Sequence, residues 1–504
     1  MKFRAIVAGC VLAAVFAANA SAQQRGGVIN VAIASEPPTL DVMSTTASIT
    51  AIVGQHIFET LYALDKDANA VPLIAVGEPE VSDEGRTNTI ALRRDVKFHN
   101  GAAMTSKDVV VSLNRWLKVS TTGRQMVRLV ESISAKDDYT IVIKLKQPLA
   151  PLTQYLASHV AMGAIYPADH LEDQNKTPIG TGPYQVKERR ADRYIQLTRF
   201  DGYTNNKGEP NGWAGARTQA ADEIRFMPVV DPSTRLEGAL AGQFDYVDAL
   251  PTEAYERLKD KPEIEARRIL YGWPFITMTQ QHKPFENVKM RQAVLAALDM
   301  DDIMSGYGKE FYQIDGALYP KPSRWNTSAG IENYNKPDPA RAAKLLKEAG
   351  YDGTPIRFMA SRYNEDQFRL SQVTVEYLKA AGFNVDFQVM DWATLNQRRV
   401  KPDTYDMYVT AYLFYPDPAL IGGFSEGSSS GWKTPARDAA LLAFNTELDP
   451  KKRMERWAEL QALVYTEVPF IKFGNIYSLV AVKKDVKGIP DRTYPYFWNA
   501  YRAN

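Results

Sequence analysis

Cysteine and histidine are scarce in this sequence of 504 residues, which contains one cysteine and five histidines. A single cysteine excludes a disulfide framework, a CxxC redox pair and a cysteine-based zinc site. The histidines are scattered, at positions 56, 99, 159, 170 and 282, so a histidine-rich metal centre is not expected. The sequence therefore predicts no metal site and no cofactor.

Net charge is also nearly absent, because 60 Lys and Arg residues balance 59 Asp and Glu residues. Binding to a nucleic-acid backbone requires a strongly basic surface, so nucleic acid is not an expected partner. Hydrophobic residues make up 45% and charged residues 24% of the chain, which is typical of a globular protein. Because a single hydrophobic core stops growing near ~250–300 residues, we expect two or three domains.

The sequence lacks an apolar run of the ~20 residues that a membrane-spanning helix needs. The apolar stretch at residues 5–18 follows Lys2 and Arg4 and precedes the small residues at 20–22. A basic start, a short apolar middle and a small-residue exit are typical of a secretory signal peptide; a buried N-terminal helix is the alternative. We predict a signal peptide at residues 1–22, cleavage after Ala22, and an exported mature protein.

Catalytic motifs are missing as well. The sequence has no G-x-S-x-G, H-E-x-x-H or P-loop motif, and we predict no catalytic residue. The glycine- and serine-rich segment 422–431 lacks the lysine of a phosphate loop and is interpreted as a mobile loop. A secreted hydrolase of oligosaccharides or peptides remains an alternative, because two catalytic carboxylates could be present among 59 acidic residues without a recognisable motif.

Predicted strands and helices alternate in two regions of the chain. The first region begins with a strand at 27–34, followed by helices at 45–61 and from Thr105 to Trp116, the latter opened by a capping box formed by Thr105 and Asp108. The second region has helices at 288–298, 339–349 and 367–381, with strands at 356–360, 384–390 and 407–411. This alternation predicts α/β lobes rather than a β-sandwich or a helix bundle.

Two long apolar and aromatic segments, 267–280 and 469–482, bracket the second region. Each is predicted to be a strand. A lobe that the chain enters and leaves through two adjacent strands is joined to the rest of the protein by a hinge, and hinge closure around a ligand is a known class of motion.

Nine short segments, in order along most of the mature chain, are similar to those of the family 5 extracellular solute-binding proteins. They are SEPPTLD (35–41), LRRDVKFHNG (92–101), TSKDV (105–109), GTGPY (180–184), PF (284–285), VKMRQA (288–293), LLKEAGY (345–351), YDM (405–407) and DP (417–418). Proteins of this family serve ABC importers of dipeptides, oligopeptides, nickel, opines and related solutes.

The resemblance implies a bilobed periplasmic-binding-protein fold with three domains, whose two lobes are joined by a strand hinge. Domain I would consist of residues 23–59, 178–273 and 474–504, domain II of 60–177 and domain III of 274–473. The glycines at 101, 180 and 182 are interpreted as backbone turn positions that hold the fold.

In peptide-binding relatives an arginine of domain III holds the ligand carboxylate, and an aspartate before the Asp-Pro pair holds the α-ammonium. The resemblance places Arg362 at the arginine and Phe414 at the aspartate. Arg362 could instead be structural and pair with Glu365 or Asp366. An ammonium buried without a counter-charge would cost several kcal/mol, so Phe414 argues against a free α-amine at that position. The alternative is that the aromatic ring stacks on a ring of the ligand or holds a cation by its π face.

Aromatic residues are concentrated in the segments expected to line the cleft. With Arg362, the predicted ligand-binding residues are Tyr271, Trp273, Trp392, Tyr412, Phe414, Tyr415 and Trp432. The resemblance thus implies a periplasmic receptor, which we expect to be monomeric and non-enzymatic. It would capture a peptide, an opine-like molecule or another small organic solute between two lobes and deliver it to the ABC permease in the inner membrane.

Overall fold

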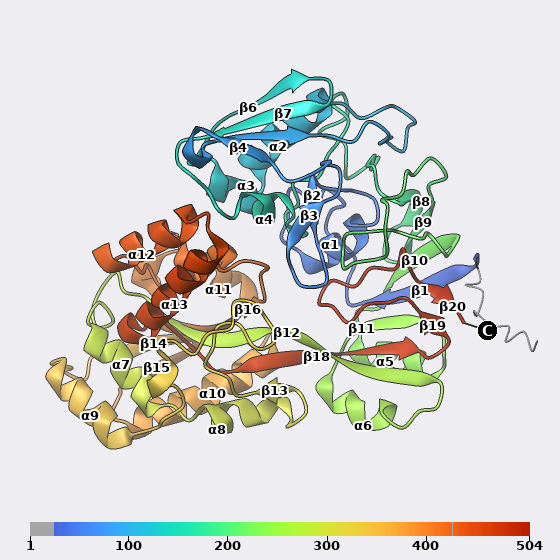
Figure 1. Cartoon of the computed structure of the whole chain (residues 1–504). Helices are drawn as coiled ribbons and strands as arrows, with labels where there is room; N and C mark the ends of the chain where they lie inside the picture. Colours follow the sequence, from blue (N-terminus) through green and yellow to red (C-terminus); the bar gives the residue numbers. More distant parts are fainter. Residues whose placement is uncertain (1–24, 426, 504) are drawn as a thin grey trace, which may run out of the picture.

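The computed structural model describes residues 25–425 and 427–503, which form a mixed α/β structure (Figure 1). The predicted signal peptide and its cleavage position lie outside the described residues. Figure 1 shows an upper group of elements in blue and cyan, a right-hand group that contains both ends of the described chain, and a left-hand group in yellow to red. The α/β class predicted from the sequence is confirmed.

One twelve-stranded sheet runs through the right-hand and left-hand groups. Its main path is β15 (Val385–Val389), β14 (Ile356–Ala360), β16 (Met407–Leu413), β12 (Ile264–Met278), β18 (Asn475–Lys483), β11 (Tyr246–Leu250), β1 (Val28–Ile33), β10 (Glu223–Pro228), β9 (Tyr194–Arg199) and β8 (Tyr184–Arg190), with β13 (Tyr312–Gln313) on β18 and β17 (Phe470–Lys472) on β12. The upper group holds a separate sheet of β4 (Glu80–Ser82), β5 (Thr87–Ala91), β7 (Thr140–Leu145) and β6 (Val130–Asp137).

Strands β12 and β18 connect the right-hand group to the left-hand group. They pair antiparallel from Ile264 opposite Lys483 to Gly272 opposite Ile476, and β12 then pairs with β16 as far as Met278. The strand predicted at 267–280 is confirmed as β12, whereas the one predicted at 469–482 is divided into β17 and β18. We call residues 25–263 and 484–503 the first lobe and residues 279–472 the second lobe.

Helices cover the sheets and supply most of the remaining core. They are α1 (Ser48–Gly54), α2 (Ser106–Val119), α3 (Thr121–Met126), α4 (Leu152–Leu156), α5 (Pro232–Leu240), α6 (Tyr255–Leu258), α7 (Val288–Ala297), α8 (Met300–Met304), α9 (Pro339–Glu348), α10 (Glu365–Ala380), α11 (Trp392–Arg398), α12 (Pro435–Thr446) and α13 (Pro450–Glu467). The predicted helices of the second region correspond to α7, α9 and α10. The predicted capping box of α2 is present, with the Thr105 amide donating to Asp108 at 2.8 Å.

Helix α1 is shorter than the helix predicted at 45–61 because the buried His56 redirects the chain. Its Nδ1 lies 3.0 Å from the Ile52 carbonyl oxygen, and its Nε2 accepts from the Phe497 amide at 2.9 Å. Burial lowers the pKa of His56 to about 3, so the ring is neutral. The side chain thereby ties the end of α1 to the C-terminal segment instead of extending the helix.

The three glycines interpreted as turn positions differ in their structural role. Gly101 has a φ of 85°, which favours glycine. Gly180 and Gly182 lie against the backbone of another segment: a Cβ would meet the Ile57 carbonyl oxygen at 2.0 Å and the His56 carbonyl oxygen at 2.5 Å, respectively. These two glycines therefore permit close backbone contact in the first lobe.

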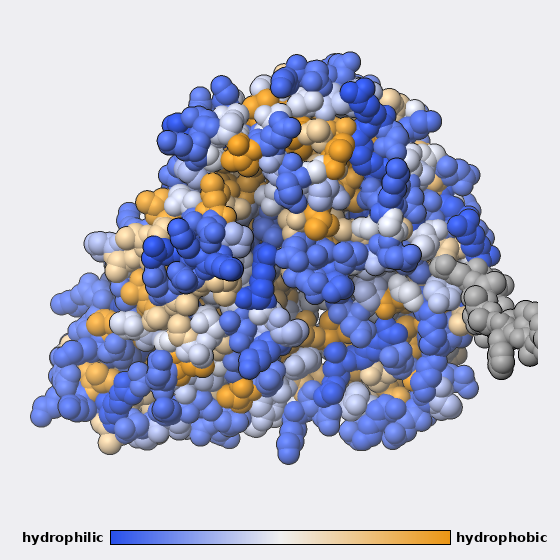
Figure 2. All heavy atoms as spheres, viewed as in Figure 1, coloured by the Kyte–Doolittle hydropathy of each residue, from blue (hydrophilic) through white to orange (hydrophobic). Residues whose placement is uncertain are grey.

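No helix within the described residues is both long enough and apolar enough to span a bilayer. Figure 2 shows hydrophilic residues over most of the visible face, with apolar residues in small groups between them. The large buried aromatic side chains instead lie inside the lobes, Trp116 and Phe58 in the first and Trp432 and Trp457 in the second.

Candidate ligand-binding cleft

Two cavities lie between the lobes, with volumes of about 680 and 530 Å³. These volumes are typical of pockets for small ligands. The first cavity is lined from the first lobe by Thr46, Thr121, Thr122, Gln125, Ser158, Val160 and Tyr494, and otherwise by residues of β12, β16 and β17, the start of the connection from α11 to β16, and segment 420–430. The second is lined by Leu64, residues 66–69, His159, Trp213, Leu270, residues 319–325, 413–416 and 491–494.

The two cavities share part of their wall. Leu413 and Tyr415, at the end of β16, line both, as does Tyr494 of the first lobe. The cavities are therefore adjacent parts of one cleft, separated by the end of strand β16.

Tyr412 lies in the wall of the first cavity. Tyr408, Thr410 and Tyr412 alternate along β16, which places them on the same face of the sheet. The ring of Tyr412 stacks on Phe275 at 4.4 Å between ring centroids. Burial raises the pKa of Tyr412, so its hydroxyl stays protonated and can donate a hydrogen bond to a ligand.

Phe414 and Tyr415 line the second cavity, and Tyr415 also lines the first. The ring centroid of Phe414 lies 6.2 Å from that of Tyr319. The aromatic residue that the resemblance places at the ammonium position is thus part of the cleft wall, and contact with a ligand remains a prediction for both residues.

Trp273, Trp432 and Tyr271 lie outside the described cavity lining. Trp273 and Trp432 are each 1% exposed. Trp273 packs against both Phe275 and Tyr412, and the indole of Trp432 donates to Glu467 at 2.5 Å. Tyr271, on β12, packs against the core of the second lobe. These three side chains support the wall, and direct ligand contact by them remains a prediction.

Arg362 and Trp392 lie on the second lobe, after the carboxyl ends of β14 and β15. The guanidinium of the exposed Arg362 lies 4.3 Å from the ring centroid of Phe368, and Trp392 stacks on Tyr363 at 5.3 Å. Neither lines a described cavity. Asp366, considered as a partner of Arg362, instead accepts from Arg369. A ligand-binding role for Arg362 and Trp392 remains a prediction.

Sequence analysis missed Arg399, the one charged side chain among the described residues that line the first cavity. It directly follows α11, and its guanidinium lies 5.6 Å from the ring centroid of Trp392. No ion pair joins it to a carboxylate among the described residues. Residues 398–401 read RRVK, so nothing in the sequence distinguishes the cavity arginine from its basic neighbours.

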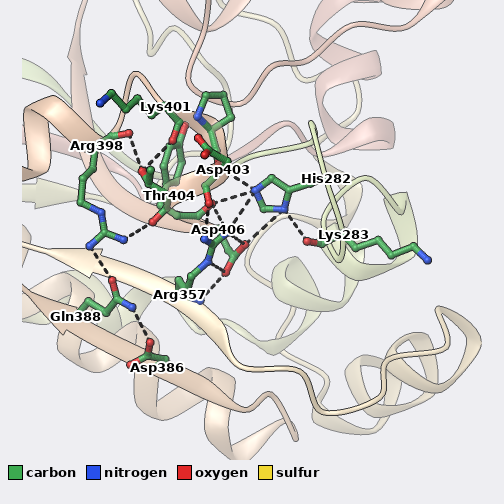
Figure 3. Close-up of polar contacts among 12 residues, drawn as sticks. His282, Lys283, Arg357, Asp386, Gln388, Arg398, Lys401, Asp403, Thr404 and Asp406 are labelled. Atoms are coloured by element: carbon green, nitrogen blue, oxygen red, sulfur yellow. Dashed lines mark hydrogen bonds and ion pairs between the residues drawn. The ribbon is translucent and has the colours of Figure 1, made fainter.

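A polar network fixes the connection that carries Arg399 (Figure 3). Arg357 donates to both carboxylate oxygens of Asp406, at 3.0 Å each, and Asp406 is 2% exposed. His282 Nε2 lies 2.9 Å from the Pro402 carbonyl oxygen. Arg398 donates to Gln388 Oε1 at 2.9 Å and also to the Thr404 carbonyl. These contacts hold the path from α11 to β16 and so fix the backbone position of Arg399.

The glycine-rich segment predicted to be a mobile loop contributes to the wall of the first cavity. The hydroxyls of Tyr405 and Tyr408 donate to the carbonyl oxygen and the side-chain oxygen of Ser429, both at 2.6 Å. A Cβ at Gly422 or Gly423 would lie 3.5 Å from the Tyr412 hydroxyl, so small residues leave room at this wall. Mobility of the segment remains a prediction, and Glu426 lies outside the described residues.

The lobes are in contact around the cavities. The Ala150 amide of the first lobe donates to the Asn445 carbonyl of the second at 2.8 Å, and Arg324 Nη1 donates to Asn69 Oδ1 at 2.6 Å. The described residues include no group of three His, Cys, Asp or Glu side chains that could hold a metal ion. The lobes thus touch beside the cleft, and its walls provide hydroxyl groups, aromatic rings and cations.

Comparison with known proteins identifies the family. Residues 69–430 match the family model "Bacterial extracellular solute-binding proteins, family 5 Middle". The chain is 28% identical over 499 residues to a probable peptide ABC transporter periplasmic-binding protein of Sinorhizobium fredii, covering 92% of this chain and 91% of that one. It is also 28% identical over 496 residues to the glutathione-binding protein GsiB of Pectobacterium atrosepticum, covering 92% of each.

Solved structures share the fold. DppA of Helicobacter pylori, in complex with the peptide STSA, has a TM-score of 0.80 at 21% identity, covering 95% of this chain and 99% of that one. AgaA of A. tumefaciens R10, in complex with agropinic acid, has a TM-score of 0.80 at 22% identity with the same coverage. The chain therefore belongs to family 5 of the bacterial extracellular solute-binding proteins, and its function is the substrate-binding role of an ABC importer.

Proposed function

We propose that this protein is a periplasmic receptor that captures a peptide or peptide-like solute bearing an acidic group, closes around it and presents it unchanged to the permease. The predicted signal peptide supports the location. The names of two relatives, a probable peptide-binding protein and a glutathione-binding protein, support a peptide-like solute. The cleft between the two lobes has the size expected for a small solute, which supports binding of the solute without a chemical reaction.

The position of Arg399 is the observation that supports an acidic group on the solute. Arg399 is half-buried and has no carboxylate partner among the described residues. The other described residues that line its cavity are uncharged and include hydroxyl-bearing side chains and glycines. A guanidinium forms two parallel hydrogen bonds with a carboxylate, and these are stronger than hydrogen bonds between neutral groups. The hydroxyl groups of both lobes would then hold the neutral part of the solute.

Closure follows from contacts that require both lobes. The first cavity takes Thr121 and Gln125 from the first lobe and Arg399 and Tyr412 from the second. A solute in this cavity touches both lobes only in the closed state, so it binds that state more tightly and shifts the equilibrium towards it. The closed form, with its contacts between Ala150 and Asn445, is the form offered to the permease.

Calorimetry with the ligand-free protein tests the proposal. A peptide-like acid and its amide have nearly the same shape, but the acid is charged and accepts hydrogen bonds at both oxygens, so we expect the acid to bind more tightly. Arg399→Gln should weaken binding of the acid by roughly 2–5 kcal/mol while leaving the amide nearly unchanged. Arg456→Gln is a matched control, because Arg456 pairs with Glu459 on the exposed face of α13. Equal loss in both variants would refute the role of Arg399.

The alternative of a secreted hydrolase of oligosaccharides or peptides is tested in the same samples. After each titration the solute is recovered and analysed by mass spectrometry. We expect the solute to be recovered intact, bound one to one by a monomer. A hydrolysed product that accumulates with time would refute a pure receptor and favour the hydrolase.

A further inference from the structure

The second cavity contains two arginines that form no ion pair with an acid of the described residues, and Asp65 favours the charged form of both guanidinium groups from a longer distance. Arg492 of the first lobe is half-buried, and Arg324 of the second lobe lies at the exposed rim. Neither has a carboxylate oxygen within 4 Å among the described residues. The two acidic residues of the lining are already engaged, Asp67 with Lys66 at 2.7 Å and Asp491 with Arg267 at 3.2 Å.

Aromatic rings hold the faces of both guanidinium groups. Arg492 lies 4.6 Å from the ring centroid of Trp213, and Arg324 lies 4.8 Å from that of Trp325. Arg492 also donates to the Lys66 carbonyl oxygen at 2.8 Å through Nη2. Its Nε and Nη1 atoms have no protein partner within the described chain, so donors on the edge of this group remain available to a ligand.

Two neutral polar groups of the same cavity lack partners. Tyr319 is 3% exposed, and its hydroxyl is buried without a hydrogen-bond partner among the described residues. The Nδ1 atom of His159, whose ring stacks on Trp213 at 4.7 Å, is likewise buried and unpaired. Burial raises the pKa of Tyr319 and lowers that of His159 to about 3. A protonated hydroxyl that is buried without a partner is costly unless a ligand satisfies it.

An aromatic residue also lines the second cavity. Phe414 lies in the wall of the second cavity, at the position where the resemblance expects an acid that holds an ammonium group. With Phe414 there and Arg492 and Arg324 in the same wall, an ammonium would lack the buried acid that the resemblance expects, because Asp67 and Asp491 of the lining are exposed and already paired. An anion would instead meet two cations and the orphan hydroxyl of Tyr319.

We propose that the second cavity is an acid-binding subsite, and that the protein consequently selects solutes with an acidic group at each end, one held by Arg399 and the other by Arg492, Arg324 and Tyr319. The shared wall of Leu413, Tyr415 and Tyr494 makes a solute that spans both cavities sterically reasonable. This inference rests on the proposed function and narrows its solute class to elongated diacids that need no free α-amine.

Three probes test the inference by calorimetry. N-succinyl-Ala-Ala carries an acid at both ends, N-acetyl-Ala-Ala only at the carboxyl end, and N-succinyl-Ala-Ala amide only at the succinyl end. We expect the diacid to bind at least tenfold more tightly than either monoacid. Tyr319→Phe should weaken binding of the diacid about threefold to tenfold, because it removes only the hydroxyl.

Two variants identify which arginine binds which acidic end of the diacid. Arg492→Gln should reduce the diacid to the affinity of one monoacid, and Arg399→Gln should reduce it to the affinity of the other. Arg456→Gln is the matched control outside both cavities, because Arg456 pairs with Glu459 on the exposed face of α13, and it should change affinity less than twofold. Arg492→Lys keeps the charge and should retain part of the preference, and thermal unfolding confirms that each variant is folded.

The outcomes separate this inference from the proposed function. A diacid that binds no more tightly than the better monoacid would overturn the second acid-binding subsite and leave a receptor for single acids. If Arg492→Gln and Arg399→Gln both removed the affinity contributed by the same acidic end of the diacid, the second subsite would also be overturned. Absence of binding to all three probes would overturn the peptide-like solute class and this inference together.

Discussion

The two cavities of the cleft are built differently. Most of the second-lobe wall of the first cavity comes from strand β16 and segment 420–430, which are close together in the sequence. The second cavity is lined by short segments at residues 66–69, 319–325, 413–416 and 491–494. The first therefore has one continuous wall of hydroxyl groups and rings, whereas the second has cations from distant segments that meet only in the folded chain.

The largest effect is expected in the support of the first cavity. Trp273 fills the space behind Tyr412 and Phe275 and is 1% exposed, so Trp273→Ala should lower the free energy of unfolding by ~3–5 kcal/mol. Urea unfolding measures this value. Trp392→Ala is the control, since Trp392 is only half-buried. A loss below 1 kcal/mol for Trp273→Ala would contradict its placement in the core.

A pH-dependent effect is expected behind the same wall, at Lys472 of β17. Lys472 is 1% exposed, and burial lowers its pKa from 10.5 to about 7. Between pH 7 and 10.5 the unfolded chain holds the proton and the folded chain does not, so the free energy of unfolding should rise with pH by a few kcal/mol across this window. Below pH 7 both forms are protonated and this contribution is flat.

Lys472→Met isolates that contribution. The variant should unfold at higher urea concentration at pH 7, and the rise between pH 7 and 10 should be smaller than in the parent chain. The difference between the two unfolding curves at each pH is the measurement. If the free energies of unfolding of the two proteins changed with pH in the same way, Lys472 would keep its proton in the folded protein.

The next effect, in the second cavity, distinguishes the two cavities by charge. Phe414→Asp places an acid beside Arg324 and Arg492, so it should weaken binding of a diacid tenfold or more, or ~1.4 kcal/mol. It should also raise affinity for dipeptides with a free α-amine, as the resemblance implies. Phe414→Leu is the control without charge. An unchanged affinity for both ligands would place Phe414 away from the solute.

The smallest effect is expected at Arg362. Its guanidinium is exposed, covers Phe368 and lies outside the described cavity lining, so Arg362→Ala should change affinity less than threefold, or about 0.7 kcal/mol. Calorimetry beside Arg399→Gln compares the two arginines directly. A loss of roughly 2–5 kcal/mol for Arg362→Ala would instead place the carboxylate there, as in peptide-binding relatives.

Much of the fold could be predicted from local patterns. The capping box at Thr105, the helices α7, α9 and α10 and the long strand β12 all follow from periodicity and terminal residues. Helix α1 could not be bounded, because its end depends on the contact of His56 with Phe497, 441 residues away. The division between β17 and β18 likewise depends on pairing with β12 and β13.

The candidate site could be predicted only in part. The aromatic segment after β16 is visible in the sequence, and Tyr412, Phe414 and Tyr415 do line the cleft. Trp273 and Trp432 are equally aromatic but lie in the core, because a large ring can fill the interior as readily as a pocket wall. The sequence alone cannot distinguish these two environments.

The sequence by itself determined the α/β class, the family and the region of the chain that carries the cleft, because periodicity and ordered motifs are local properties. Only the tertiary structure decided which arginines have no ion pair with an acid. At the end of one helix, Arg399 lines the first cavity whereas its neighbour Arg398 does not. Arg492 and Arg324 line the second cavity from opposite lobes. Charge compensation depends on distance in space, and that distance is set by packing of the lobes.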